Sequence, residues 1–434
     1  MTTTGNAEGR GKRSPTRVSR RSTPASTPRR PKSAARDAAR DAAARDAAAP
    51  GAAAPGAATP QTLLAVYRPD IAQALSAMDA PSYRYAQVYE HLFRRPLRSF
   101  SEATVLPTDT RAALDGLGVS TLTIAGSRSS PDGATKLLLA GRDGSYIETV
   151  IMRYRDRVTA CISSQVGCPV GCVFCATGAM GFRRNLSVAE IVDQARLASA
   201  LVAEEDRRVS NLVYMGMGEP LLNLQAVLDS IRILTDPQGM GVAHRALSVS
   251  TIGIPSGILR LARAEPQVNL ALSLHAADDR TRALLVPRSF RHTLPEVLES
   301  AWGHFAITHR KLLVEYVLLD GVNDSADDAR RLAALLRGHV VTVNLLAWNP
   351  VSQHGAPSSG PALRPRAGAA LPSSFRPSAP AAIAAFRNAL VSAHIEAVIR
   401  RSKGSGIQAA CGQLAGRRQS YGARTTEDQP SALD

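Results

Sequence analysis

Two hydrophobic patterns alternate along most of this chain. Seven short apolar runs have the length and composition of buried strands, and they cover residues 146–152, 158–165, 211–216, 246–252, 268–274, 312–319 and 340–347. The last six runs each end in a polar or Gly-rich loop, and amphipathic segments lie between them. Strands that alternate with helices form parallel sheets. We therefore expect an α/β fold, a partial (β/α)6 barrel with its active site on the loops at the C-terminal strand ends.

Three of the amphipathic segments begin with a helix-capping pair. In such a pair, a Ser or Thr side chain accepts from the backbone N–H three residues later, and an acidic side chain at that position reaches back. The pairs are Ser187 with Glu190, Thr293 with Glu296, and Ser325 with Asp328. They place helix starts between the strand-like runs, as the barrel requires.

The segments around this core differ in composition. Residues 1–60 are nearly all Ala, Arg, Pro, Ser and Thr, too poor in apolar mass to fold, so we expect a disordered basic tail. Spaced apolar residues predict a small N-terminal helical accessory domain over 61–134. The core then spans 135–420 and holds a Pro-, Ser- and Ala-rich flexible insertion at 351–381. A disordered C-terminal tail is expected over 421–434.

The net charge of +16 predicts an anionic partner such as nucleic acid. Residues 1–60 hold 12 Lys and Arg against 4 Asp and Glu, so half of that charge lies in the tail. The tail is either an arm that attracts RNA or a solvated extension without a role. No apolar run approaches the roughly 18 residues of a membrane span. Five cysteines, four of them within residues 161–175, do not resemble a secreted disulfide framework. We expect a cytoplasmic protein without a membrane partner.

Three cysteines form a C-x3-C-x2-C motif: Cys168, Cys172 and Cys175. Iron–sulfur clusters are usually held by four cysteines, so three in one short loop leave one iron open to another ligand. The alternative, a structural zinc ion, needs four ligands, and the second Cys or His pair typical of zinc sites is missing. The motif therefore predicts a [4Fe-4S] cluster of the kind used by radical S-adenosylmethionine (SAM) enzymes, and with it a radical SAM barrel.

Two cysteines lie outside the motif. Cys161 falls in the strand-like run that leads to the triad, and Cys411 lies far downstream between Gly404, Gly406 and Gly412. Taken alone, either is more typical of a buried core thiol than of a catalyst. The glycines around Cys411 nevertheless favour a loop that brings a thiol to the mouth of a barrel.

Seven stretches together closely resemble the RlmN/Cfr family of radical SAM RNA methyltransferases. They are CISSQVGC at 161–168, FCATG at 174–178, RNLSVAEIVDQ at 184–194, MGMGEPLLN at 215–223, STIG at 250–253, SLH at 273–275 and AACGQLAG at 409–416. The resemblance covers roughly residues 62–416. So many motifs in one order are far more specific than the cysteine triad alone.

The resemblance implies a covalent mechanism that uses two SAM molecules per turnover. One SAM methylates Cys411, and a second is reductively cleaved at the cluster to a 5′-deoxyadenosyl radical that takes a hydrogen from the S-methyl group. The carbon radical then adds to an electron-poor adenine carbon. Cys161 releases the RNA–protein adduct by forming a transient disulfide with Cys411. The family's proton acceptor matches Glu148.

The resemblance also assigns the cofactor-binding residues. Gly218 and Glu219 match the motif that holds the SAM amino group. Five more positions match SAM-contacting residues, each at or just beyond a predicted strand end: Ser250, Ser273, Leu274, His275 and Asn349.

The implied substrates are 23S rRNA, at the peptidyl-transferase centre, and tRNA, at the adenosine 3′ of the anticodon, both methylated at adenine C2. A Cfr-type enzyme, which methylates adenine C8 and confers antibiotic resistance, is the close alternative; Val166 and Trp348 favour the C2 group. A non-catalytic RNA-binding protein with a structural metal would explain the charge and the triad, but it leaves Glu219 and Cys411 without a role. We expect a monomer reduced by flavodoxin or ferredoxin.

Overall fold

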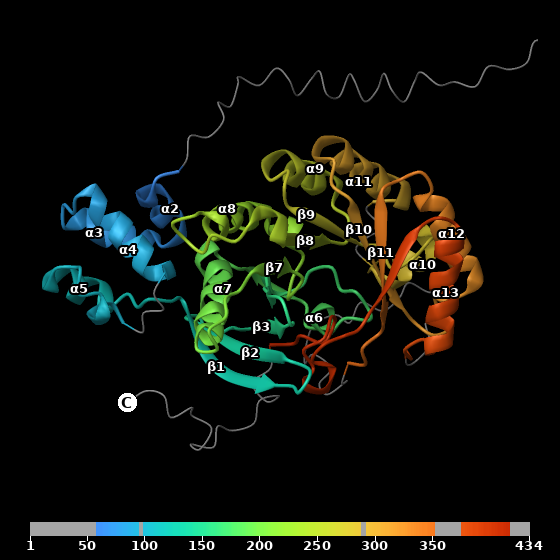
Figure 1. Ribbon diagram of the computed structural model, residues 1–434, viewed down its shortest axis with the longest axis horizontal. Coiled ribbons are helices and arrows are strands. Elements are labelled where there is room, and N and C mark those ends of the chain that lie inside the picture. Colours follow the sequence, from blue (N-terminus) through green and yellow to red (C-terminus); the bar gives the residue numbers. More distant parts are fainter. Residues whose placement is uncertain (1–57, 95–98, 288–291, 352–374, 417–434) are drawn as a thin grey trace, which may run out of the picture. The chain divides into compact units, whose positions relative to one another are not determined.

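The computed structural model of this protein describes residues 58–94, 99–287, 292–351 and 375–416. Its centre is a ten-stranded sheet in the order β1-β2-β3-β4-β7-β8-β9-β10-β11-β12 (Figure 1). The strands are β1 (Leu122–Ser129), β2 (Ala134–Gly141), β3 (Tyr146–Arg153), β4 (Val158–Cys161), β7 (Asn211–Tyr214), β8 (Leu247–Thr251), β9 (Asn269–Ser273), β10 (Leu312–Leu318), β11 (Val341–Ala347) and β12 (Glu396–Arg400).

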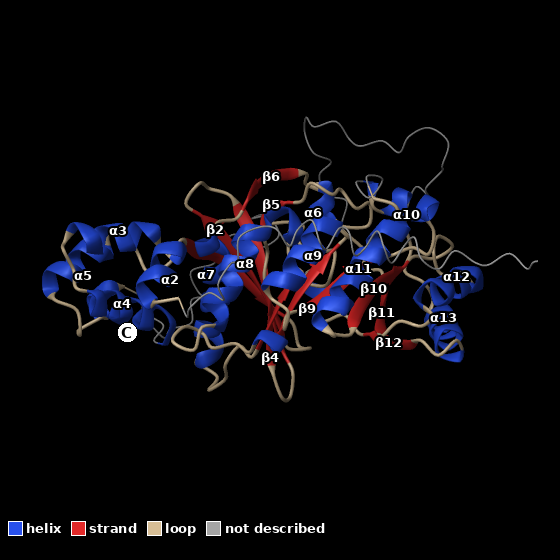
Figure 2. Cartoon of the chain, turned by 90° about the horizontal axis from the view of Figure 1, so that it is seen from above, coloured by secondary structure: helices blue, strands red, loops and turns tan. Residues whose placement is uncertain are grey.

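The sheet has an antiparallel part and a parallel part. β1 to β4 form an antiparallel meander, and every neighbouring pair from β4 to β12 is parallel. Because parallel strands need crossover connections, helices lie between them and cover one face of the sheet (Figure 2). These helices are α7 (Val188–Ala203), α8 (Leu224–Thr235), α9 (Pro255–Ala264), α11 (Leu294–Thr308), α12 (Ala326–Leu336) and α13 (Pro380–Ser392). Between β9 and β10, α10 (Asp279–Leu285) instead contributes Leu285 to an apolar cluster beside Cys168 and Cys172.

The predicted mixed α/β architecture with a parallel sheet is confirmed. All three capping pairs form complete capping boxes, with the Ser or Thr side chain and the acidic side chain each bonded to the other's backbone N–H. The strand order is open, with β1 and β12 at its two ends among the described residues. Residues 401–416 cross from β12 back to the β2–β3 side, where Lys403 donates to the carbonyl oxygen of Arg153.

Several details differ from the sequence prediction, and one of them is strand β2, which was not among the seven predicted runs. Leu122–Ser129, which fell in the range expected to be helical, forms strand β1; only two of its eight residues are buried, so its apolar alternation is weak. β12 was missed for the same reason, because Ala397 alone is buried in it. The run 158–165 is not one strand: β4 ends at Cys161, and β5 (Gln165–Gly167) pairs instead with β6 (Phe182–Asn185) in a separate two-stranded sheet.

Four of the described α-helices lie near the N-terminus, and the first of them packs against α7 and α8. They are α2 (Pro60–Tyr67), α3 (Pro69–Ala77), α4 (Ser82–Arg94) and α5 (Thr108–Asp115). The Tyr67 hydroxyl donates to Asp193 Oδ1 on α7 at 2.5 Å, and Arg196 Nη1 donates to the same oxygen at 2.8 Å. This buried contact fixes α2 against α7, and Figure 1 shows both α7 and α8 beside it.

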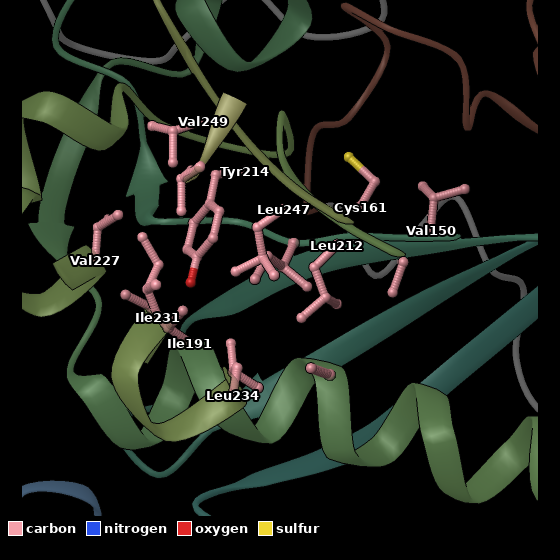
Figure 3. Packing of buried hydrophobic residues seen from close by; sticks show 14 of the residues in the cluster. Val150, Cys161, Ile191, Leu212, Tyr214, Val227, Ile231, Leu234, Leu247 and Val249 are labelled. Carbon is pink, nitrogen blue, oxygen red and sulfur yellow. The ribbon is translucent and has the colours of Figure 1, made fainter. Parts of the chain in front are cut away.

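The core of the parallel part lies between the sheet and the covering helices. Leu212, Leu247 and Val249 on the strands pack with Ile191 and Ile231 on the helices, all buried (Figure 3). Figure 3 also shows the Cys161 sulfur pointing away from these helices. Alternate residues of a strand face opposite sides, so the other face of β4 is free to line the barrel interior.

Several predicted segments lie outside the described residues: positions 1–57 of the N-terminal tail, positions 352–374 of the insertion, and positions 417–434, which include the C-terminal tail. Within the insertion's described end, Pro377 forms a β-bridge with Leu319, and α13 begins at Pro380. In the described ranges, no helix has the length and apolarity needed to cross a membrane.

Candidate functional site

A cavity at the carboxyl ends of the parallel strands collects most of the predicted site residues; we call it the triad cavity. Its wall includes ten of them: Cys168, Cys172, Cys175, Gly218, Glu219, Ser250, Ser273, His275, Asn349 and Cys411. Three predicted residues, Cys161, Leu274 and Glu148, do not line it. Residues that are more than two hundred positions apart in the chain thus meet in one space, as expected for a barrel of this kind.

The β5–β6 hairpin shapes the loop that carries the three thiols. Gly167 has φ +74°, and a Cβ there would lie 1.9 Å from the Gly181 carbonyl oxygen, so only glycine fits. The same carbonyl accepts from the Cys168 backbone N–H at 2.9 Å. The backbone N–H of Cys175 donates to the carbonyl of Cys172 at 3.1 Å, which curls the loop on itself.

The three thiols are half-buried and pack against a small apolar cluster that contains Val170, Phe174 and Ile252. Three thiol ligands in one apolar-walled cavity fit a [4Fe-4S] cluster with one open iron. In the described ranges, no three His, Cys, Asp or Glu side chains surround a point at which a single metal ion would bind.

Glu219 is held at the cavity wall by backbone N–H groups. Its carboxylate accepts from Leu221 at 3.0 Å and from Ile252 at 2.9 Å, and its own N–H donates to Gln165 Oε1 at 2.8 Å. Burial raises the pKa of Glu219 to about 7, and the two backbone bonds oppose that rise. Gly218 has φ +105°, and a Cβ there would lie 2.7 Å from the Cβ of Gln165. A buried carboxylate in this position is suited to pair with a ligand's ammonium group.

Polar side chains from neighbouring strands line the same cavity as Glu219. The hydroxyls of Ser250 on β8 and Ser273 on β9 lie 3.4 Å apart. His275 accepts from the Val317 N–H at its Nδ1, 3.2 Å away, so its ring proton sits on Nε2. Burial, together with the nearby Arg282, lowers the pKa of His275 to about 3 and keeps the ring neutral. Leu274 is buried beneath this surface.

The loop with Cys411 is anchored to the loop with the triad. The Gly412 carbonyl accepts from the Ala176 N–H at 2.7 Å, and the Leu414 carbonyl accepts from the Thr177 hydroxyl at 2.6 Å. Asn349 Nδ2 donates to the carbonyl oxygen of Cys411 at 3.2 Å. Desolvation by the surrounding protein, with the nearby Glu315 and Cys175, raises the pKa of the Cys411 thiol to about 11. The loop therefore presents this thiol beside Cys175.

A second cavity adjoins the first; we call it the Cys161 cavity. Cys161, at the end of β4, lines it together with Cys411, Cys175 and Glu315, and the last three also line the triad cavity. Burial, with the neighbouring Cys411, raises the pKa of the Cys161 thiol. All five cysteines are free thiols. Cys411 thus has access to both cavities, and Cys161 has access to one.

The comparisons with known proteins agree with this arrangement. Residues 162–333 match the Radical SAM superfamily. The chain is 42% identical over 334 residues to the probable dual-specificity RNA methyltransferase RlmN of Thermus thermophilus, an overlap of 77% of this chain and 89% of that protein. It is 40% identical to the dual-specificity RNA methyltransferase RlmN of Syntrophobacter fumaroxidans, over 80% of this chain and 95% of the relative.

Among solved structures, a radical SAM methyltransferase from Sphaerobacter thermophilus matches with a TM-score of 0.73 and 39% identity, over 83% of this chain and 98% of the other. The chain belongs to the RlmN family. The predicted recognition and enzyme class, a SAM-dependent radical methyltransferase, are confirmed. As a member of the radical SAM superfamily, it uses a [4Fe-4S] cluster and SAM.

Glu148 occupies a different place from the rest of the predicted RlmN-type site. It lies on β3, 1% exposed, and lines neither cavity. One carboxylate oxygen pairs with Lys136 Nζ at 3.0 Å, and the other accepts from the Ala415 N–H at 2.7 Å. Its expected role as proton acceptor stays a prediction.

The sequence reading missed a polar group in the Cys161 cavity. Glu315 Oε1 accepts from Asn344 Nδ2 at 2.8 Å, and Asn344 Oδ1 accepts from Arg400 Nε at 2.8 Å. Burial raises the pKa of Glu315, and the two partners oppose the rise. The available signal was a single carboxylate inside the apolar run LLVEYVL of β10. Arg400, Arg401 and Lys403 add positive charge to the cavity wall.

Proposed function

We propose that this protein methylates C2 of adenosine in 23S rRNA and in the tRNA anticodon loop, with Cys411 as the methyl carrier and Cys161 as the resolving thiol. One observation carries the proposal: Cys411 lies where the triad cavity and the Cys161 cavity meet. A methyl carrier must reach SAM first and the base afterwards. The names of the RlmN relatives support RNA as the substrate class.

When bound, the cluster and two SAM molecules supply a methyl group and the one-electron chemistry that activates it. The protein's side chains bind and orient these groups and carry the methyl group to the base. Cys168, Cys172 and Cys175 hold the cluster, and Glu219 binds the SAM ammonium group with a carboxylate fixed by two backbone N–H groups. Ser250, Ser273, His275 and Asn349, which line the same cavity, bind the other polar groups of SAM. Their fixed positions orient SAM toward Cys411.

The base enters the Cys161 cavity, because that cavity holds both thiols the reaction needs. Enzymes that modify base atoms take the nucleotide out of its stack. Arg400, Arg401 and Lys403 supply the positive charge that binds the RNA backbone near the opening. After the methylene group joins Cys411 to the base, Cys161 attacks the Cys411 sulfur. The S–C bond to the RNA breaks and leaves its electron pair on the methylene carbon, which takes up a proton to become the methyl group once the proton originally on C2 has been removed by a base. A disulfide forms between Cys161 and Cys411, and its later reduction restores both thiols.

The proposal also includes the electron donor, the oligomeric state, the cellular location and the choice of C2 over C8. A flavodoxin or ferredoxin supplies the electron for SAM cleavage, and the protein acts as a monomer in the cytoplasm. C2 is preferred to C8 because the relatives carry the RlmN name. Trp348, one of the residues that favoured this choice, donates its Nε1–H to the Phe174 carbonyl at 2.9 Å and so supports the triad loop.

Mass spectrometry of nucleosides from treated RNA tests the proposed function. Cluster-loaded enzyme, SAM and a reductant are added to unmethylated 23S rRNA and tRNA, and 2-methyladenosine is expected in both. Cys411→Ala is the matched control and is expected to give none. 8-Methyladenosine without 2-methyladenosine would identify a Cfr-type enzyme, and normal turnover by Cys411→Ala would refute the carrier role.

A further inference from the structure

A buried ion pair brackets the loop that carries Cys411. Lys136 on β2 and Glu148 on β3 form a salt bridge of 3.0 Å, and their side chains are 2% and 1% exposed. Each partner also bonds the Cys411 loop: Lys136 Nζ donates to the Gln408 carbonyl at 3.1 Å, and Glu148 Oε2 accepts from the Ala415 N–H at 2.7 Å. The two bonds fall three residues before and four residues after Cys411.

The loop backbone depends on such outside contacts. Gln408 has φ +55°, in the left-handed region that is costly for a residue with a side chain, whereas Gly412, at φ +83°, adopts it as a glycine without that cost. A buried ion pair is a weak source of stability, since well-packed apolar residues often replace it without loss. Its strict geometry, in contrast, fixes the groups that are bonded to it. The pair ties both ends of the loop to the sheet, while Ala176 and Thr177 tie its middle to the triad loop.

We propose that Lys136 and Glu148 are positioning residues that hold the Cys411 loop at the meeting point of the two cavities. The inference rests on the proposed function, because it assigns the pair a task in methyl transfer through Cys411. It places the pair's effect in the first half-reaction, the transfer of a methyl group from SAM to the Cys411 thiol. No proton leaves adenine in that step, so the step separates positioning from a proton-acceptor role for Glu148.

The test follows the half-reaction without RNA. Cluster-loaded full-length enzyme is mixed with SAM labelled in its methyl group, and peptide mass spectrometry measures the rate of label transfer to Cys411. Lys136→Met is expected to slow the transfer about tenfold to a hundredfold, the scale of a small misplacement of a reacting group. Lys136→Arg keeps the positive charge and the donors, and it is expected to restore most of the rate. Glu148→Gln keeps an acceptor for the Ala415 amide and is expected to lose less than Lys136→Met.

Two further measurements separate positioning from general damage. Hydrogen exchange is expected to speed up at the Ala415 amide and across residues 408–415 in Lys136→Met, with iron content unchanged. The matched control is Lys311→Met, which removes the exposed pair between Lys311 and Glu396, 2.6 Å apart, and is expected to leave the rate unchanged. If Lys136→Met does not fold, the near-isosteric Glu148→Gln decides the question.

The outcomes are distinct. Slower Cys411 methylation and faster loop exchange in the variants support the inference. Wild-type rates of Cys411 methylation in both Lys136→Met and Glu148→Gln overturn it. If, in that case, Glu148→Gln accumulates an RNA adduct when RNA is added, Glu148 acts as the proton acceptor instead. If the unmodified enzyme itself never methylates Cys411, the proposed function fails and the inference fails with it.

Discussion

A buried glutamine on α7, Gln194, holds the backbone between β4 and the triad. Its Oε1 accepts from the Ser163 N–H at 2.7 Å and from the Thr149 hydroxyl at 2.8 Å. Its Nε2 donates to the carbonyl oxygens of Ser163 at 3.0 Å and Glu190 at 3.1 Å. Ser163 Oγ in turn accepts from the Met217 N–H at 2.9 Å, in the loop that leads to Glu219. One side chain thus supports two walls of the site.

The change Gln194→Met keeps nearly the same volume and removes all four hydrogen bonds. Gln194 is fully buried, so water cannot take the place of its amide as hydrogen-bond partner of the Ser163 N–H and carbonyl. Each unsatisfied buried polar group costs about 1–3 kcal/mol, and the methionine fills the space with little further loss. With the buried Thr149 hydroxyl, which also loses its bond to Gln194, three such groups give an expected loss of about 3–9 kcal/mol in the free energy of unfolding.

Chemical denaturation followed by circular dichroism measures this loss. The matched control is Gln225→Met, because Gln225 makes an exposed bond from Nε2 to Asp229 and is expected to change stability by less than about 0.5 kcal/mol. SAM affinity is also expected to fall in Gln194→Met alone, since the loop leading to Glu219 loses its support. Equal midpoints for the two variants would refute the reasoning.

Three further predictions concern the metal centre and the RNA. Gly167→Ala is expected to abolish cluster binding, measured as iron per chain, because its Cβ would collide with the Gly181 carbonyl oxygen; a normal iron content would contradict this. Cys172→Ser is expected to lower iron from about four per chain to a small fraction, and loss of the visible cluster absorbance checks it. Arg401→Ala is expected to weaken RNA binding and to reduce the slope of log affinity against log salt by about one. An unchanged slope would exclude a phosphate contact at Arg401.

Much of the fold follows from local signals in the sequence. Capping boxes such as Ser187 with Glu190 act within one helical turn, and apolar runs reveal strands that are buried on both faces. β1 and β12 gave no such signal, because few of their residues are buried. Those strands are fixed by pairing with neighbours, which a periodicity reading does not detect.

The candidate site was also predictable from the sequence only in part. The triad and Glu219 stand in compact motifs, and family resemblance connected them to Cys411. The Lys136–Glu148 pair had no such signal, since its bonds to the Cys411 loop join residues 272 and 267 positions apart. Contacts between residues so far apart form only when the chain after β12 returns to the β2–β3 side of the sheet. From the sequence alone, Glu148 was therefore a carboxylate in a predicted strand, and only the family resemblance gave it a role.

Trapping the covalent intermediate tests the central claim most directly. Cys161→Ala enzyme, loaded with cluster and supplied with SAM, reductant and RNA, lacks the thiol that resolves the adduct. Digestion and tandem mass spectrometry are expected to find a peptide in which the Cys411 sulfur is joined through one methylene carbon to C2 of adenosine. Free 2-methyladenosine formed at the normal rate without an adduct, or a link through another cysteine, would contradict the account.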